Sequence, residues 1–98
     1  MVKGTTSSGF AFEIPEGLDT DFRFIKAYTW TICGDEDKAM KGVVELVSAI
    51  FANNEEEEKR LYEHLGKKHD GRVPFDVLFA EINEIIEIAK SSDEQIKN

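Results

Sequence analysis

The sequence predicts a mainly α-helical protein: a small four-helix orthogonal bundle with a short N-terminal β-strand or extended arm. Two long stretches, residues 75–89 and 40–51, carry apolar side chains at helical spacing, and the one clear period-two pattern is confined to residues 10–14. The most regular stripe consists of Phe75, Leu78, Phe79, Ile82, Ile85, Ile86 and Ala89.

The length predicts a single domain. The chain has 98 residues, of which 41% are hydrophobic and 33% are charged, a composition typical of globular proteins. We expect a flexible Gly/Ser/Thr-rich N-terminus over residues 1–9 and a helical domain over residues 10–90. Residues 91–98 lack an apolar face, so we expect a flexible polar tail there.

A short strand is expected near the N-terminus. Phe10, Phe12 and Ile14 alternate with other residues, and Pro15 ends the segment. A strand needs a partner, and no second convincing strand exists in the sequence. Two interpretations therefore remain: the segment pairs with another chain, or it lies as an extended arm on the helices.

Residues 22–32 predict the first helix, preceded by the good N-cap candidates Asp19 and Asp21 and followed by Gly34. This helix carries two apolar stripes. One consists of Phe22, Ile25, Thr29 and Ile32, and the other of Phe24, Tyr28 and Thr31. A helix that is apolar on two sides is either central in the bundle or shared with a partner.

The second helix follows the acidic residues 35–37, which suit a helix N-terminus. Its stripe consists of Met40, Val43, Val44, Val47, Ile50 and Phe51. Gly42 interrupts the helix at a cost of about 1 kcal/mol relative to alanine. Close packing against another helix would explain this glycine.

Residues 55–90 predict a helix, a tight turn and a second helix. Asn54 can cap the first helix, whose shorter stripe contains Leu61, Tyr62 and Leu65. The turn resembles a calcium-binding loop, but aligning Gly71 with the invariant glycine leaves oxygen ligands missing at three positions. We therefore expect a structural turn and no metal site.

The net charge of −8 argues against a nucleic-acid partner, because an acidic surface repels phosphate. No apolar run is long enough to span a membrane. One cysteine, Cys33, excludes an intrachain disulfide, favours a reducing compartment and is expected to be a small buried apolar residue. We expect no cofactor and no enzyme activity, since no catalytic motif is present and the histidines do not show zinc-ligand spacing.

Aromatic residues provide the candidates for a contact surface. A domain of this size has too small a core to bury every aromatic side chain. Aromatic residues are also enriched at protein interfaces. We expect the partner-binding residues to be Phe10, Phe12, Trp30 and Tyr62.

Six segments together resemble the tail assembly chaperones of long-tailed bacteriophages and their prophages. They are GFAFEI (9–14), DFRF (21–24), GVVELV (42–47), LYEHL (61–65), DGRVP (70–74) and EINEII (81–86). The resemblance covers about residues 9–90. The sequence departs from it at residues 30–33 (WTIC), where a more ordinary Ala/Leu/Glu helix is expected.

The resemblance implies a helical, non-catalytic protein of the bacterial host cytoplasm that is absent from the finished phage particle. Such chaperones bind the long tape-measure protein, keep it soluble and help to recruit tail-tube subunits. In many relatives a frameshift adds a C-terminal extension, so the short tail here would be the unextended form. The alternatives are a generic acidic helical adaptor or homo-oligomerisation domain, and an acidic DNA mimic.

Overall fold

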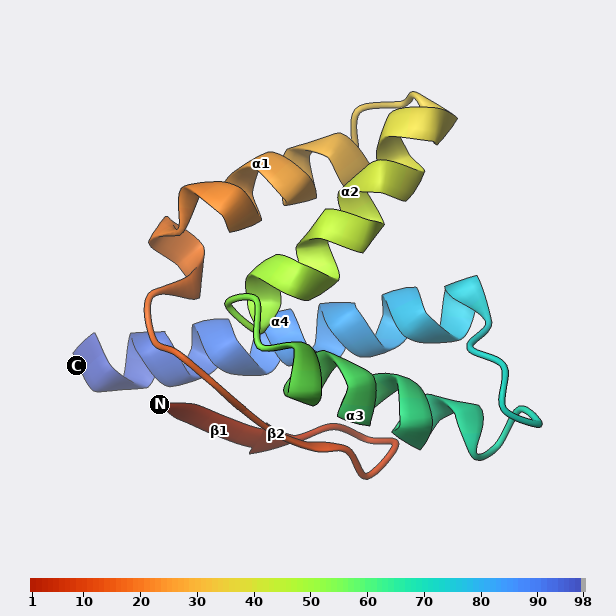
Figure 1. The fold of residues 1–98 in the computed structure, drawn as a ribbon. Coiled ribbons are helices and arrows are strands. Elements are labelled where there is room, and N and C mark those ends of the chain that lie inside the picture. Colours follow the sequence, from red (N-terminus) through yellow and green to blue (C-terminus); the bar gives the residue numbers. More distant parts are fainter. Residues whose placement is uncertain (98) are drawn as a thin grey trace.

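Four helices and an N-terminal β-hairpin form the fold (Figure 1). The structure, a computed structural model, describes residues 1–97, with side chains as far as Ser91. The elements in chain order are β1 (Val2–Thr5), β2 (Ala11–Ile14), a 3-10 turn η1 (Leu18–Thr20), α1 (Phe22–Thr31), α2 (Glu36–Ile50), α3 (Glu55–Gly66) and α4 (Phe75–Lys97). The predicted mainly helical bundle with an N-terminal strand is confirmed.

The N-terminal strand pairs within the chain. β1 runs antiparallel to β2, with Val2 opposite Ile14, and the side chain of Val2 is buried. The prediction of a flexible segment over residues 1–9 is therefore wrong, as is the expectation that the strand lacks a partner in its own chain. The Val2–Thr5 segment was missed because a strand of four residues with one large apolar side chain shows no periodicity.

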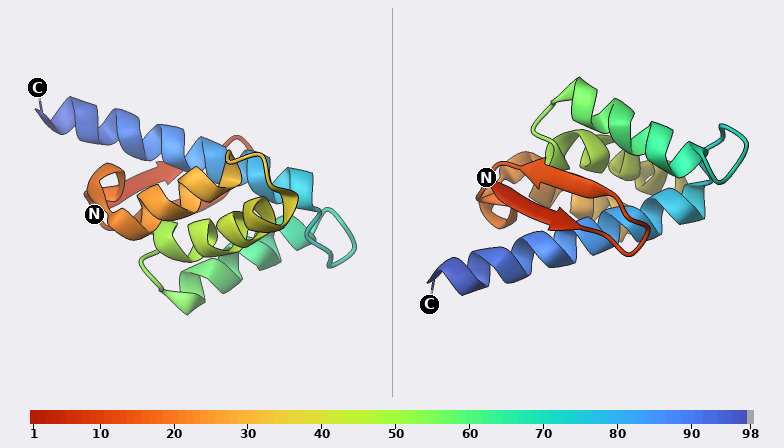
Figure 2. Two further views of the ribbon diagram at one scale, coloured as in Figure 1. Left: turned by 90° about the horizontal axis from the view of Figure 1, so that it is seen from above. Right: turned by 90° about the horizontal axis from the view of Figure 1, so that it is seen from below.

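The hairpin lies between α3 and α4 when the molecule is seen from below (Figure 2, right). Arg60 on α3 donates a hydrogen bond to the carbonyl oxygen of Ala11, 2.5 Å away, and its guanidinium lies 4.7 Å from the ring centre of Phe10. On the other side, a Cβ atom at Gly4 would lie only 2.7 Å from Ile88 of α4. The absence of a side chain at Gly4 thus lets β1 approach α4 closely.

Polar side chains fix the starts of three helices. The carboxylates of Asp21 and Asp35 accept hydrogen bonds from the backbone N–H groups of Arg23 and Lys38 at the starts of α1 and α2. The side-chain oxygen of Asn54 does the same at the start of α3. Each cap satisfies a backbone donor that has no partner within the helix. The caps Asp21 and Asn54 were predicted, whereas Asp35 was expected only as an acid that suits the N-terminus of α2.

Helices α1 and α2 lie side by side and form one layer above α4 (Figure 2, left). A Cβ atom at Gly42 would lie 2.9 Å from the carbonyl oxygen of Ala27, from the amide nitrogen of Thr31 and from Cβ of Trp30. The predicted reason for Gly42 is confirmed, because only a residue without a side chain permits this approach.

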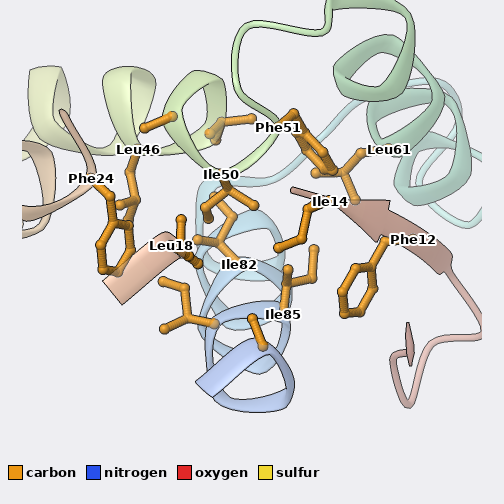
Figure 3. Close-up of a cluster of buried hydrophobic side chains, with 14 of the residues drawn as sticks. Phe12, Ile14, Leu18, Phe24, Leu46, Ile50, Phe51, Leu61, Ile82 and Ile85 are labelled. Atoms are coloured by element: carbon orange, nitrogen blue, oxygen red, sulfur yellow. The ribbon is translucent and has the colours of Figure 1, made fainter. Parts of the chain in front are cut away.

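All layers contribute to one core (Figure 3). Apolar side chains from the hairpin, α2, α3 and α4 meet at its centre. The largest fully buried ones are Phe10, Ile14, Leu46, Val47, Ile50, Leu61, Ile82 and Ile85. The C-terminal half of the regular stripe on α4 is thus core, whereas Phe75 at its start is exposed and stacks on Phe79.

The turn before α4 contains two residues with left-handed backbone. Asp70 and Gly71 both have positive φ angles, 56° and 86°, which favour glycine and a short polar residue. The backbone is helical through Lys97, so residues 91–97 continue α4, while Asn98 lies outside the described residues. The predicted flexibility of the tail stays a prediction. Within residues 1–97, no helix combines the length and apolar character that a membrane span requires.

Candidate functional site

An exposed apolar stripe runs along α1. Phe22, Ile25 and Ile32 expose 73%, 43% and 67% of their surface. Phe22 and Ile25 lie three residues apart on one face of α1, and Ile32 follows directly after its last residue, where the backbone is no longer helical. Isolated exposed apolar residues are ordinary, but large ones aligned on a single face mark a candidate contact surface.

The stripe is exposed because α1 can bury one face only. Phe24 and Ala27 point to the interior, where Ala27 meets Gly42 of α2. Helix α1 lies at the edge of the molecule (Figure 1), and the large apolar side chains of its outer face are exposed. Of the two positions that the double stripe allowed, the structure excludes the central one and leaves the outer stripe available to a partner.

The polar atom within the stripe is already satisfied. Thr29 lies between Ile25 and Ile32, and its hydroxyl donates a hydrogen bond to the carbonyl oxygen of Ile25 at 2.8 Å. The hydroxyl group is thus engaged by the helix backbone. A partner can cover this position without leaving the Thr29 hydroxyl unpaired.

Two lysines lie beside the stripe, each over an aromatic ring. The ammonium nitrogen of Lys26 lies 5.0 Å from the ring centre of Trp30. On the side that faces α4, the ammonium nitrogen of Lys90 lies 5.9 Å from the ring centre of Tyr28. These cation–π contacts hold both lysine side chains against α1. The borders of the stripe are therefore positively charged in a protein of net charge −8.

A shallow groove separates this stripe from a smaller apolar area on α2. The groove has a volume of about 320 Å³, and its walls include Arg23 and Lys26 of α1 and Val44, Glu45 and Ser48 of α2. Val44 is exposed, as is Met40 one turn earlier. The predicted apolar stripe of α2 is thus buried in part only: Val43 faces the core, whereas Met40 and Val44, four residues apart, lie together on an exposed face.

The four predicted contact residues do not form a common surface. Phe10 and Phe12 expose only 1% and 3% of their surface and belong to the core, so their expected role in an exposed contact surface is wrong. The hairpin buries them because β1 supplies the missing strand. Trp30 and Tyr62 are half-buried on different helices. Residue type, an apparently unpaired strand and the two-sided helix at 22–32 suggested these aromatics, whereas the helical spacing at 22–32 was the signal for the exposed stripe.

Tyr62 packs against the core and donates a hydrogen bond from its hydroxyl to Glu58 at 2.8 Å. Burial, followed by this hydrogen bond and the charge of Glu58, raises the pKa of the Tyr62 hydroxyl above its ordinary value. Above about pH 10 an unfolded tyrosine releases its proton while folded Tyr62 retains it. The unfolded state then binds fewer protons, so stability falls as pH rises.

We therefore expect the free energy of unfolding to decline above about pH 10, and to decline less steeply in a Tyr62→Phe variant. Urea unfolding at a series of alkaline pH values measures the effect. Tyr28→Phe is the matched control and should retain the decline of the parent protein. Identical pH dependence in the parent and Tyr62→Phe would contradict the assignment.

A second cluster joins a serine, a histidine and a carboxylate at the hairpin turn. The Ser8 hydroxyl lies 3.0 Å from Oε2 of Glu81 and 3.1 Å from Nε2 of His64. The same Glu81 oxygen accepts a hydrogen bond from the buried hydroxyl of Thr6 at 2.6 Å. Serine, histidine and an acid in contact invite comparison with a catalytic triad.

The geometry of this cluster does not match a triad. Nε2 of His64 also lies 3.2 Å from the carbonyl oxygen of Ser8. A carbonyl oxygen only accepts, so Nε2 donates there and cannot take the proton of the Ser8 hydroxyl. The carboxylate of Glu81 binds the serine rather than the imidazole. We interpret the cluster as a clamp that fastens the hairpin turn to α3 and α4.

Other chemical groups are dispersed. Among residues 1–91, whose side chains the structure describes, no three His, Cys, Asp or Glu side chains gather as a metal ion would require. Cys33 is exposed, so its expected burial is wrong: it follows the end of α1, beyond the reach of the core. No protein-family model, curated protein or solved structure matches the chain. The exposed stripe of α1 is therefore the candidate functional site on structural grounds.

Proposed function

We propose that the protein is a non-catalytic tail assembly chaperone that binds a helical segment of a phage tape-measure protein. It would act in the cytoplasm of the bacterial host, help to bring tail-tube subunits to the complex, and be absent from the finished particle. The sequence resemblance suggests this class. The observation that supports the binding role is the exposed stripe formed by Phe22 and Ile25 on α1 and by Ile32 just after its end.

The stripe suits an amphipathic helix as its ligand. A long helix with an apolar stripe must hide that stripe from water until assembly, and the outer face of α1 offers a complementary one. Burying a large apolar side chain gains about 1.5–3 kcal/mol, whereas association costs at least about 4 kcal/mol. Three such side chains alone therefore give weak, reversible binding, which suits a protein that must leave the assembly.

The remaining surface favours solubility. The chain carries 20 acidic and 12 basic residues, and the first turn of α3 alone contains four glutamates, Glu55 to Glu58. A strongly negative surface keeps a complex from associating further through like-charge repulsion. Covering an apolar stripe with an acidic domain would thus keep an aggregation-prone partner dispersed.

Co-expression with a tape-measure fragment tests the proposal. We expect the parent protein to increase the soluble fraction of the fragment several-fold, and a Phe22→Ser/Ile25→Ser variant to lose most of that increase, because it removes the apolar contact area. Phe75→Ser is the matched control, since Phe75 is also an exposed phenylalanine but begins α4. A fragment that is no more soluble with the parent protein than without it contradicts the proposed function.

A further inference from the structure

The charges around the exposed stripe are the reverse of those of the whole chain. Helix α1 (Phe22–Thr31) contains Arg23 and Lys26 and no acidic residue. Lys90 of α4 adds a third cation on the opposite border, over Tyr28. The middle of the stripe is thus bordered by positive charge on both sides, although acids outnumber bases in the chain by 20 to 12.

One acid, Glu45 of α2, lines the same groove as Arg23 and Lys26, and further acidic residues lie beyond both ends of α1. Asp19 and Asp21 precede its first turn, and residues 35–37 (DED) follow its last. In the sequence the acids nearest to Lys90 are Glu87, an exposed residue three positions earlier on α4, and Asp93, three positions later. Along the helix axis the charge therefore changes from negative to positive and back to negative.

We infer that the stripe of Phe22, Ile25 and Ile32 accepts an amphipathic helix whose own apolar stripe is bordered at its middle by aspartate or glutamate. This inference rests on the proposed function, in which a helix is the ligand, and adds the charge pattern of that helix. Acidic side chains of the ligand would lie opposite Lys26 and Lys90. Each acid would form an ion pair with its lysine at the rim of the apolar contact. Such pairs select the partner and its register more than they add affinity.

The same charges disfavour a second copy of this chain as the occupant. If two α1 helices met through their stripes, the lysine borders of one copy would face those of the other. Lysines that face each other across an interface repel, and the repulsion is strongest where water is excluded. An acid-bordered helix meets attraction at these positions, so the charge pattern distinguishes the two occupants.

Synthetic peptides of about 20 residues, long enough to form a helix on binding, are the probes. One carries an apolar helical stripe bordered by glutamates, the second the same stripe bordered by lysines, and the third glutamates with the stripe replaced by glutamine. Fluorescence anisotropy of a labelled peptide measures binding. Trp30, the one tryptophan of the chain, contacts Lys26 and gives a second readout at the site itself.

We expect the glutamate-bordered peptide to bind about tenfold more tightly than the lysine-bordered one at low salt, since two rim charges change from attraction to repulsion. The ratio should shrink at about 0.5 M salt, where screening acts within a few ångströms. The peptide without an apolar stripe should not bind. A Lys26→Glu/Lys90→Glu variant should reverse the preference, whereas Lys68→Glu, an exposed cation in the turn before α4, should not change it.

Circular dichroism establishes that each variant is folded, and Lys26→Gln/Lys90→Gln provides a milder change that should abolish the preference. Equal affinity for both charged peptides, lost in Phe22→Ser/Ile25→Ser, overturns the inference but leaves the proposed function standing. No binding by any peptide overturns the inference as well. The proposed function fails with it only if the parent protein also leaves the tape-measure fragment insoluble.

Discussion

Replacing Gly42 with valine is expected to lower the free energy of unfolding by about 3 kcal/mol. The new Cβ would lie 2.9 Å from the backbone of Ala27 and Thr31, and backbone atoms cannot rotate away as a flexible side chain can. Helix α1 must therefore shift off α2, an overpacking strain of about 1–3 kcal/mol or more. Thermal and urea unfolding followed by circular dichroism measure the loss.

A graded series distinguishes this strain from helix propensity. Gly42→Ala should lower the free energy of unfolding by only about 1–2 kcal/mol. The higher helix propensity of alanine, about 1 kcal/mol over glycine, offsets part of the strain. Lys41→Val introduces the same residue at the neighbouring exposed position and should change stability by about 0.5 kcal/mol or less. If Gly42→Val is as stable as Lys41→Val, the close approach of α1 to α2 is incorrect.

Replacing Glu81 with alanine is expected to lower the free energy of unfolding by about 2–3 kcal/mol. Glu81 exposes only 5% of its surface, and its carboxylate accepts hydrogen bonds from the hydroxyls of Thr6 and Ser8. Hydrogen bonds to a charged group contribute about 1.5–3 kcal/mol, and removing Glu81 leaves the buried Thr6 hydroxyl without this acceptor. Urea unfolding measures the loss, and hydrogen exchange at β1 should show that the hairpin opens first.

Glu84 is the matched control for Glu81, because it lies one turn further along the same helix and binds the same hairpin turn. Its carboxylate accepts hydrogen bonds from the backbone and hydroxyl of Ser7, but on the exposed side of the turn. Glu84→Ala should therefore cost about 1 kcal/mol. Equal losses for the two variants contradict a buried clamp. Because the stripe of α1 lies elsewhere, folded Glu81→Ala should bind the peptides as the parent protein does.

Local signals in the sequence were sufficient wherever one segment determines its own structure. Asp21 and Asn54 cap their helices as predicted, and Asp35 caps α2 where an acid was expected, because each accepts a hydrogen bond from a backbone group only two or three residues away. The turn at Asp70 and Gly71 follows from residues that tolerate positive φ. These features depend on near neighbours, which the sequence lists directly.

Pairing between distant segments was where prediction failed. Glu81 and His64 looked like ordinary helix residues, yet they bind the turn at Thr6 and Ser8, more than 50 residues away in the chain. The same pairing converts the N-terminal segment from an expected flexible region into strand β1. Contacts between residues so far apart in the sequence leave no periodic pattern in either segment. The pairing could therefore not be recognised from the residues of one segment alone.

The exposed stripe of α1 depends both on local sequence and on the tertiary structure. The sequence by itself determined that helix 22–32 has two apolar sides, because helical spacing assigns each residue to a face. Only the tertiary structure decided that Phe24 and Ala27 face inward and Phe22 and Ile25 outward, with Lys90 of α4 brought to the border. The physical reason is that a helix at the edge of a bundle can bury one face, and the choice depends on where its neighbours lie.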